Sequence, residues 1–75
     1  MSKVLDTKGF NCPIPVLKAR RAMRELDAKD ELTVLATDPA SMIDMRHFCN
    51  TAGHELMSAT EVEGVFTYVI RKADD

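Results

Sequence analysis

Two prolines, Pro13 and Pro15, constrain the fold of this chain more than any other feature, because they stand just before a stretch of helical periodicity. Proline lacks a backbone N–H and fixes φ at roughly −65°, so it fits the first turn of a helix and breaks the helix further in. The pair therefore predicts where a helix begins, and the rest of the chain has to be arranged around that point.

The apolar residues between positions 13 and 26 recur at three- and four-residue spacing, which predicts an amphipathic helix with one buried face. That face consists of Val16, Ala19, Ala22, Met23 and Leu26. Lys18, Arg21 and Arg24 fall largely on the opposite side. This is the charge pattern of a helix that covers a core.

Runs of apolar and β-branched residues predict four strands. The predicted strands cover residues 4–6, 32–37, 56–62 and 65–71. A turn at residues 7–9 ends the first strand, and Glu63 with Gly64 joins the last two strands as a hairpin. The strand at residues 32–37 is continuously apolar or β-branched, so we expect it to be buried.

A second helix is predicted after the strand at residues 32–37. Asp38 suits its N-cap, Pro39 suits its first position, and Gly53 suits a left-handed C-cap. The apolar stripe between them consists of Met42, Met45, Phe48, Cys49 and Ala52. Methionine at helical spacing usually packs in a core, so we assign Met42 and Met45 to packing.

The resulting order of elements is βαβαββ. A strand, helix, strand unit predicts a right-handed crossover between parallel strands, whereas the closing hairpin is antiparallel. We therefore expect an α+β two-layer sandwich, with a mixed four-stranded sheet and two helices on one face. The chain shows no repeat, linker or low-complexity tract, which predicts a single domain over residues 1–75.

The composition excludes several classes of protein. With 45% hydrophobic and 29% charged residues, the 75-residue chain has the proportions of a globular domain, and it is too short for a large catalytic cavity. No window approaches the roughly 20 apolar residues that span a bilayer, and no secretion signal is visible, so we expect a cytoplasmic protein. The net charge of −2 disfavours a general nucleic-acid binder.

Cys12 stands directly before Pro13 and therefore at or next to the N-cap of the first helix. The positive end of a helix dipole favours a thiolate and lowers a cysteine pKa from about 8.5 to about 3.5–7.5. Lys8, Lys18 and Arg20 are expected to add to this effect. The alternative is a small buried filler in the turn, but we find no packing reason for a cysteine before two helix-starting prolines.

The sequence resembles the TusA family of small sulfur-carrier proteins, also called SirA-like. The residues that carry the resemblance are Asp6, Gly9, the Cys-Pro-Ile-Pro motif at 12–15, Arg20, Asp38-Pro39, Phe48-Cys49 and Tyr-Val-Ile-Arg-Lys at 68–72. The chain departs from many relatives at Ile14, where Glu is frequent, and at Asn11, where a basic residue is frequent. These departures bear on which partner the protein recognises.

The resemblance implies a βαβαββ sandwich similar to the C-terminal domain of a bacterial translation initiation factor. It also implies a sulfurtransferase-type carrier, in which Cys12 is the catalytic residue and carries a persulfide, with Gly9, Pro13 and Pro15 supporting the motif and the helix start. The sulfur donor would be a cysteine desulfurase or a rhodanese-like protein. A partner thiol would accept the sulfur for tRNA thiolation, molybdenum-cofactor assembly or sulfur oxidation, without a cofactor.

Four basic residues make the first predicted helix locally positive: Lys18, Arg20, Arg21 and Arg24. They are either an ordinary solvated face or a partner-docking surface beside Cys12 that also stabilises its thiolate. Cys49 lies on the apolar stripe, where packing is the simpler interpretation, since a resolving thiol would need to lie close to Cys12. His47, Cys49 and His54 do not have the spacing of zinc ligands, so no metal site is expected.

Two other functions remain open. The first is an RNA-binding or regulatory module that uses the basic first helix, although the chain has no surplus positive charge and few aromatic residues. The second is a thiol redox sensor, which would require Cys12 to pair with Cys49. The expected partners are therefore protein thiols, with neither a membrane nor nucleic acid in direct contact.

Overall fold

The elements follow one another in the predicted order in a computed structural model that describes residues 2–73. They are β1 (Ser2–Asp6), α1 (Ile14–Arg24), β2 (Glu31–Ala36), α2 (Ser41–Ala52), β3 (Glu55–Val62) and β4 (Val65–Arg71). The strand β4 has the predicted bounds, and the other three strands begin one or two residues earlier than predicted. No helix within residues 2–73 is long and apolar enough to cross a membrane.

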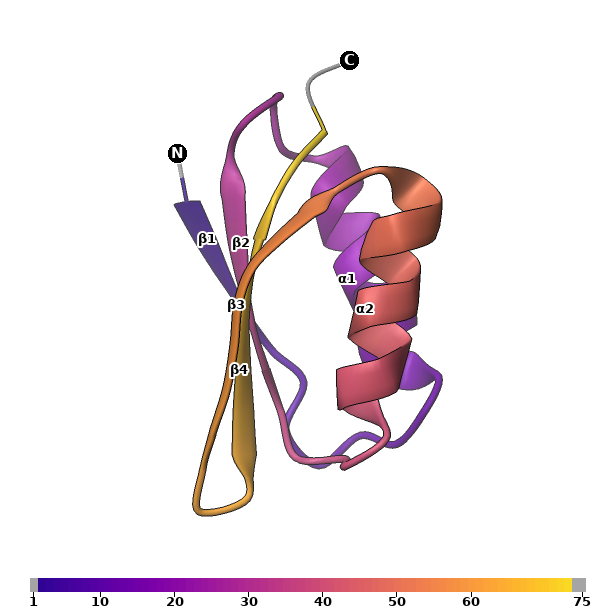
Figure 1. The fold of residues 1–75 in the computed structure, drawn as a ribbon, viewed down its shortest axis with the longest axis vertical. Helices are drawn as coiled ribbons and strands as arrows, with labels where there is room; N and C mark the ends of the chain where they lie inside the picture. Colours follow the sequence, from indigo (N-terminus) through magenta and orange to yellow (C-terminus); the bar gives the residue numbers. More distant parts are fainter. Residues whose placement is uncertain (1, 74–75) are drawn as a thin grey trace.

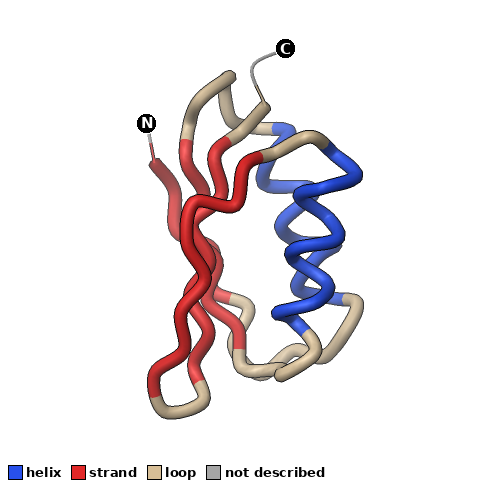
Figure 2. Tube along the Cα trace, in the orientation of Figure 1, coloured by secondary structure: helices blue, strands red, loops and turns tan. Residues whose placement is uncertain are grey.

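The strands form a sheet in the order β1-β2-β4-β3 (Figure 1). β1 runs parallel to β2, with Leu5 opposite Val34, because α1 connects them as a crossover. β4 is antiparallel to both β2 and β3. Figure 2 shows both helices on the same face of this sheet. The predicted two-layer α+β sandwich with a mixed sheet is therefore confirmed.

The core lies between the sheet and the two helices. Alternate residues of the two central strands are buried on the helix side: Leu32, Val34, Ala36, Phe66, Tyr68 and Ile70. The helices contribute Ala19, Ala22, Met23, Met45, Phe48 and Cys49. Val16, Leu26 and Met42 are partly buried against this cluster, as expected, but Ala52 is exposed at the end of α2.

The helix starts differ from the predicted ones. Pro13 is the N-cap of α1 and Pro15 lies in its first turn, so the helix begins at Ile14. The predicted N-cap of α2 is wrong, because α2 begins at Ser41, after a turn. The Asp38 carboxylate instead accepts hydrogen bonds from backbone N–H groups in this turn and in the loop before α1. Asp38 therefore holds both the turn before α2 and the loop before α1, while the helix itself starts at Ser41.

The predicted ends of α2 and of the hairpin are confirmed. Gly53 has φ +78° and closes α2 with a left-handed cap whose N–H donates to the carbonyl of Cys49. Glu63 and Gly64 both have positive φ, at +50° and +81°, so the hairpin turn has the primed geometry that suits twisted strands. Glycine adopts this conformation without strain, whereas Glu63 occupies the less favourable position.

Candidate functional site

Cys12 lies in the loop between β1 and α1, and its thiol is exposed. Because β1 and β2 are parallel neighbours, the loops that follow them emerge at the same end of the sheet. Two hydrogen bonds join these loops: Cys12 N–H donates to Asp38 Oδ2 at 2.6 Å, and Gly9 N–H donates to Thr37 Oγ1 at 2.9 Å. The cysteine therefore sits on a braced loop.

The start of this loop is fixed by Thr7, which is fully buried. Its backbone N–H and its hydroxyl both donate to the carbonyl of Leu35, at 2.8 and 2.6 Å. Gly9 then turns the chain at φ +87°, in the left-handed region that favours glycine. The backbone on the N-terminal side of Cys12 is thus anchored to β2 before it reaches the thiol.

The electrostatic surroundings of Cys12 are acidic, contrary to the sequence prediction. A hydrogen bond to Asp44 on α2, some desolvation, and the charges of Asp44 and Asp38 all raise the pKa of the Cys12 thiol above its ordinary value. The predicted lowering of this pKa is wrong, because the charged groups that act on the thiol are two carboxylates, one in the loop after β2 and one on α2, and none of the predicted cations is among them. Sequence reasoning missed Asp44, since only the packing of α2 beside the loop brings it near Cys12.

Exposed apolar side chains flank the thiol along the chain. Phe10 is 44% exposed, Ile14 is 37% exposed and Leu17 is 49% exposed. The ammonium of Lys18 lies 4.9 Å from the centre of the Phe10 ring. Phe10 and Leu17 were not singled out from the sequence, whereas Ile14 was noted there as a departure from the family motif. Both Ile14 and Leu17 fall outside the buried stripe of the predicted helix. We call Phe10, Ile14 and Leu17 the apolar rim of Cys12.

The four basic residues of α1 do not form one surface. Lys18 and Arg21 lie beside Lys3 and Glu25 in a depression next to β1. Arg20 and Arg24 instead line a pocket between the two helices. The shifts in the Cys12 pKa come from carboxylates and desolvation, so stabilisation of the thiolate by these cations has no support in the geometry.

Cys49 is buried in the core, on the α2 face that packs against the sheet. Burial raises the pKa of its thiol to about 11, so it is protonated and unreactive at neutral pH. Both cysteines are free. The packing role predicted for Cys49 agrees with this position. A pairing of Cys12 with Cys49 would require Cys49 to leave the core.

His54 makes a backbone contact instead of joining a ligand cluster. Its Nδ1 atom accepts a 2.9 Å hydrogen bond from the N–H of Ala73, and its ring lies 5.5 Å from that of Phe48. His47 is exposed on α2. Within residues 2–73, no three side chains of the metal-binding types come together.

Fold and site together define a small α+β domain that presents one exposed thiol on a braced loop and keeps a second thiol buried. Residues 3–72 match the model of the family described as "Sulfurtransferase TusA". The chain belongs to the TusA family of sulfur-carrier proteins, as its motif residues predict.

Individual relatives agree with this assignment. The chain is 47% identical over 72 residues to the sulfur carrier protein TusA of Pseudomonas putida strain GB-1, which covers 96% of this chain and 90% of that protein. It is 39% identical over 69 residues to TusA of Allochromatium vinosum, covering 92% and 91% of the two chains. The crystal structure of a SirA-like protein from Desulfitobacterium hafniense superimposes with a TM-score of 0.84 at 29% identity, covering 95% and 97%.

Proposed function

We propose that this protein carries sulfane sulfur as a persulfide on Cys12 and passes it to the thiol of a partner protein. The observation that carries the proposal is the contrast between its two cysteines. Cys12 is exposed on a loop tied to Asp38, whereas Cys49 is buried and protonated. Only Cys12 can meet a partner's sulfur without unfolding the domain.

The loading step is a thiol exchange with no net oxidation. The Cys12 sulfur attacks the outer sulfur of a donor persulfide, a new S–S bond forms, and the donor's S–S bond breaks to release its thiolate. The proton of the Cys12 thiol passes to the Asp44 carboxylate, which accepts its hydrogen bond. It then passes to the departing donor thiolate, so charge and protons balance. Delivery reverses these roles, with an acceptor thiolate attacking the outer sulfur on Cys12.

A raised pKa of Cys12 suits a carrier that reacts only when docked. Away from a partner the thiol is largely protonated, which limits side reactions with oxidants and electrophiles. A docked partner excludes water from the loop and brings its persulfide to the sulfur, with Asp44 positioned to take the proton. The carboxylate thus acts as the proton acceptor for Cys12 in this proposal.

Recognition of partners is assigned to the surface next to the sulfur. The apolar rim of Cys12 gives a partner apolar area to bury, and Lys18 and Arg21 add positive charge on the same helix. Ile14 belongs to this rim and lies between the two prolines of the Cys-Pro-Ile-Pro motif. The donor is a cysteine desulfurase or a rhodanese-like protein, and the acceptor serves tRNA thiolation, molybdenum-cofactor assembly or sulfur oxidation.

The proposed compartment is the cytoplasm. A persulfide carrier requires its thiol to remain reduced, and thiols stay reduced in the cytosol.

The experiment is intact mass spectrometry after incubation with a cysteine desulfurase plus cysteine, and separately with a rhodanese-like donor plus thiosulfate. We expect one added sulfur on the wild-type protein with at least one donor, and its loss on treatment with a reducing thiol. Cys12→Ser should keep the fold and gain no sulfur, whereas the matched control Cys49→Ser should load as the wild type does. Sulfur loading on Cys12→Ser, or no loading of the wild type by either donor, would overturn the proposal.

A further inference from the structure

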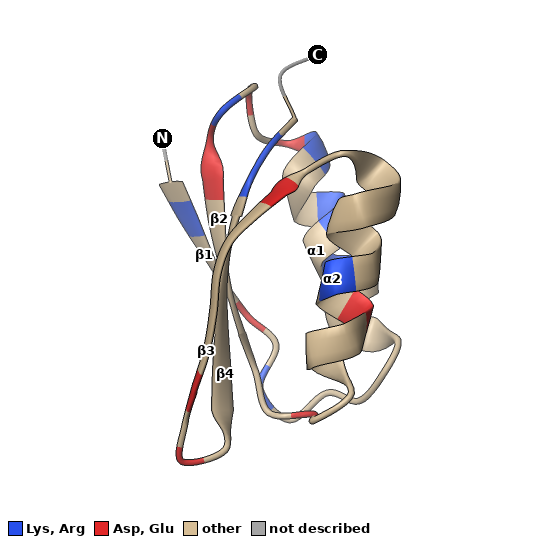
Figure 3. Cartoon of the chain, viewed as in Figure 1, with Lys and Arg blue, Asp and Glu red and all other residues tan. Residues whose placement is uncertain are grey.

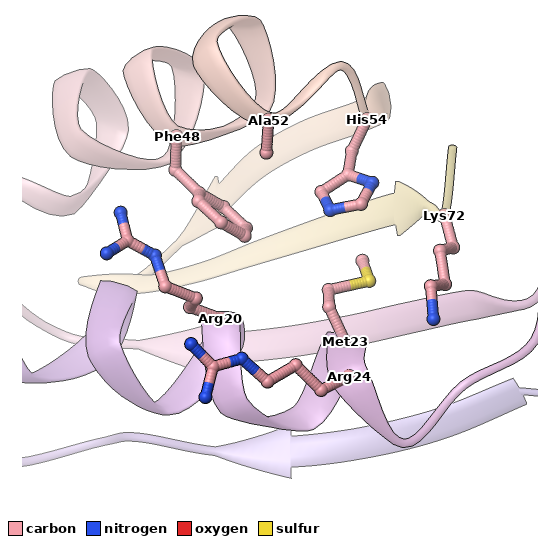
Figure 4. Close-up of a pocket in the computed structure, with 7 residues that line it drawn as sticks. All are labelled: Arg20, Met23, Arg24, Phe48, Ala52, His54 and Lys72. Atoms are coloured by element: carbon pink, nitrogen blue, oxygen red, sulfur yellow. The ribbon is translucent and has the colours of Figure 1, made fainter. Parts of the chain in front are cut away.

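A pocket between the C-terminal half of α1 and the end of α2 combines an apolar floor with a basic rim (Figure 4). The floor is formed by Met23, Phe48 and Ala52, and the rim by Arg20, Arg24, His54 and Lys72. Its volume of about 310 Å³ falls at the lower end of the range of about 300–1,000 Å³ typical of small-ligand sites. Among residues 2–73, no carboxylate lines it.

In the part of the chain that the structure describes, the two guanidinium groups of the rim have no compensating charge. Arg20 and Arg24 are four residues apart and therefore neighbours on α1, an arrangement that is unfavourable for like charges. Helix α1 contains no acidic residue (Figure 3), and within residues 2–73 neither arginine forms an ion pair. Arg20 lies 5.8 Å from the centre of the Phe48 ring, which keeps its guanidinium at the pocket. An anion placed here would relieve this repulsion.

The remaining rim residues are held in place by the backbone. His54 Nδ1 accepts the N–H of Ala73, so the hydrogen of the neutral ring is on Nε2, which Figure 4 shows on the side that faces α1. Lys72 Nζ donates to the carbonyl of Leu26. These contacts leave an imidazole N–H donor and an ammonium group at the other end of the pocket from the two guanidinium groups (Figure 4).

We propose that this pocket binds the phosphate monoester of a small organic molecule, of which a mononucleotide is a suitable probe. A phosphate monoester carries a charge of about −1.5 to −2 near neutral pH and three acceptor oxygens, which suits the pair of guanidinium groups better than the single charge of a carboxylate does. A guanidinium group can donate two parallel hydrogen bonds to two oxygens of one phosphate group. The apolar floor accommodates the organic part, which inorganic phosphate lacks. The proposal stands independently of sulfur transfer by Cys12.

The test is a titration of the ¹⁵N-labelled protein with 5′-AMP, followed by backbone NMR. We expect saturable shifts around Arg24, Ala52 and His54, with weaker binding of inorganic phosphate. Arg24→Gln should weaken 5′-AMP binding by about tenfold. Arg21→Gln removes the same charge from the opposite flank of the same helix and should change the affinity little. Arg20→Gln provides a second pocket variant if Arg24→Gln does not give a folded spectrum.

Three results would overturn the proposal. The first is the absence of saturable shifts in the wild-type protein. The second is equal weakening by Arg24→Gln and Arg21→Gln, which would show attraction to the general charge of α1. The third is binding of a glutamate-rich peptide at the pocket that is tighter than 5′-AMP binding, which would identify the site as a protein contact. Sulfur loading of Cys12 is measured separately, so its failure would leave these results unaffected.

Discussion

The backbone N–H of Cys12 donates a 2.6 Å hydrogen bond to Oδ2 of Asp38, 26 residues further along the chain. The other oxygen of the same carboxylate accepts the N–H of Ala40 at 3.1 Å. One aspartate therefore fixes both the loop that carries the thiol and the turn that leads into α2. This coupling links the stability of the domain to the geometry of its proposed reactive loop.

Asp38→Ala should destabilise the protein by about 1–3 kcal/mol, because two backbone N–H groups lose a charged acceptor. Urea unfolding followed by circular dichroism measures this change. The matched control is Asp27→Ala, at an exposed aspartate in the loop after α1, which should cost much less. If the Asp38 variant were as stable as the wild type, water would satisfy the two backbone N–H groups as well as the carboxylate does.

Asp44→Asn should lower the pKa of the Cys12 thiol, because Asp44 is the largest cause of its elevation. The rate of alkylation by iodoacetamide rises with pH as the thiolate forms, so its midpoint should move to lower pH. Each pKa unit gives about tenfold more thiolate at neutral pH. Sulfur loading from a protein donor should nevertheless slow, because the proposed proton acceptor is lost. An unmoved alkylation midpoint would contradict the contact, and Asp27→Asn serves as the control.

The two cysteines should differ sharply in labelling. Native wild-type protein should take up one alkyl group, on Cys12, and native Cys12→Ser should take up none on the same timescale. After denaturation the wild-type protein should take up two, because burial no longer protects Cys49 or raises its pKa. Mass spectrometry counts the labels. Rapid native labelling of Cys49 would show that α2 opens more readily than its packing implies.

Leu17→Ser should weaken loading by a protein donor by about tenfold, since a central apolar contact often dominates a transient interface. The folding stability should change little, because Leu17 is 49% exposed. Val62→Ser, at a 69% exposed position in β3, is the control for loss of exposed apolar surface. A small persulfide donor should load the Leu17 variant and the wild type equally. A loss of loading with that donor as well would point to damage at the thiol instead of the interface.

The hydroxyl groups of Ser41 and Tyr68 lie 2.6 Å apart inside the core. Tyr68→Phe should cost about 1–3 kcal/mol, because it leaves the buried Ser41 hydroxyl without its partner. The double variant with Ser41→Ala should cost less than the sum of the two single variants, which a double-mutant cycle of unfolding free energies measures. Additive costs would indicate that the two hydroxyl groups act independently.

The sequence was most informative where structure follows local periodicity. The run of apolar and β-branched residues at 65–71 predicted the observed bounds of β4, and the apolar stripe predicted the buried Ala19 and Met23 of α1. It was least informative at the start of α2. Asp38 has the chemistry of an N-cap, but in the structure its carboxylate accepts N–H groups on either side of the predicted cap. Local sequence propensity contains no information about a hydrogen-bond partner 26 residues away, such as the N–H of Cys12.

The candidate site also combines features that adjacent residues determine with features that only the fold determines. The Cys-Pro-Ile-Pro motif was sufficient to single out Cys12 as a candidate and to locate the start of a helix, because both depend on residues adjacent in the chain. Together with the other motif residues and the order of elements, it also indicated the TusA family. The electrostatic environment of Cys12 depends on what the fold brings beside it. Packing of α2 next to the loop places Asp44 there, the loop after β2 adds Asp38, and these two carboxylates raise the pKa that the helix end alone would lower. Coulomb interactions depend on distance in space, so only the tertiary structure decided the state of this thiol.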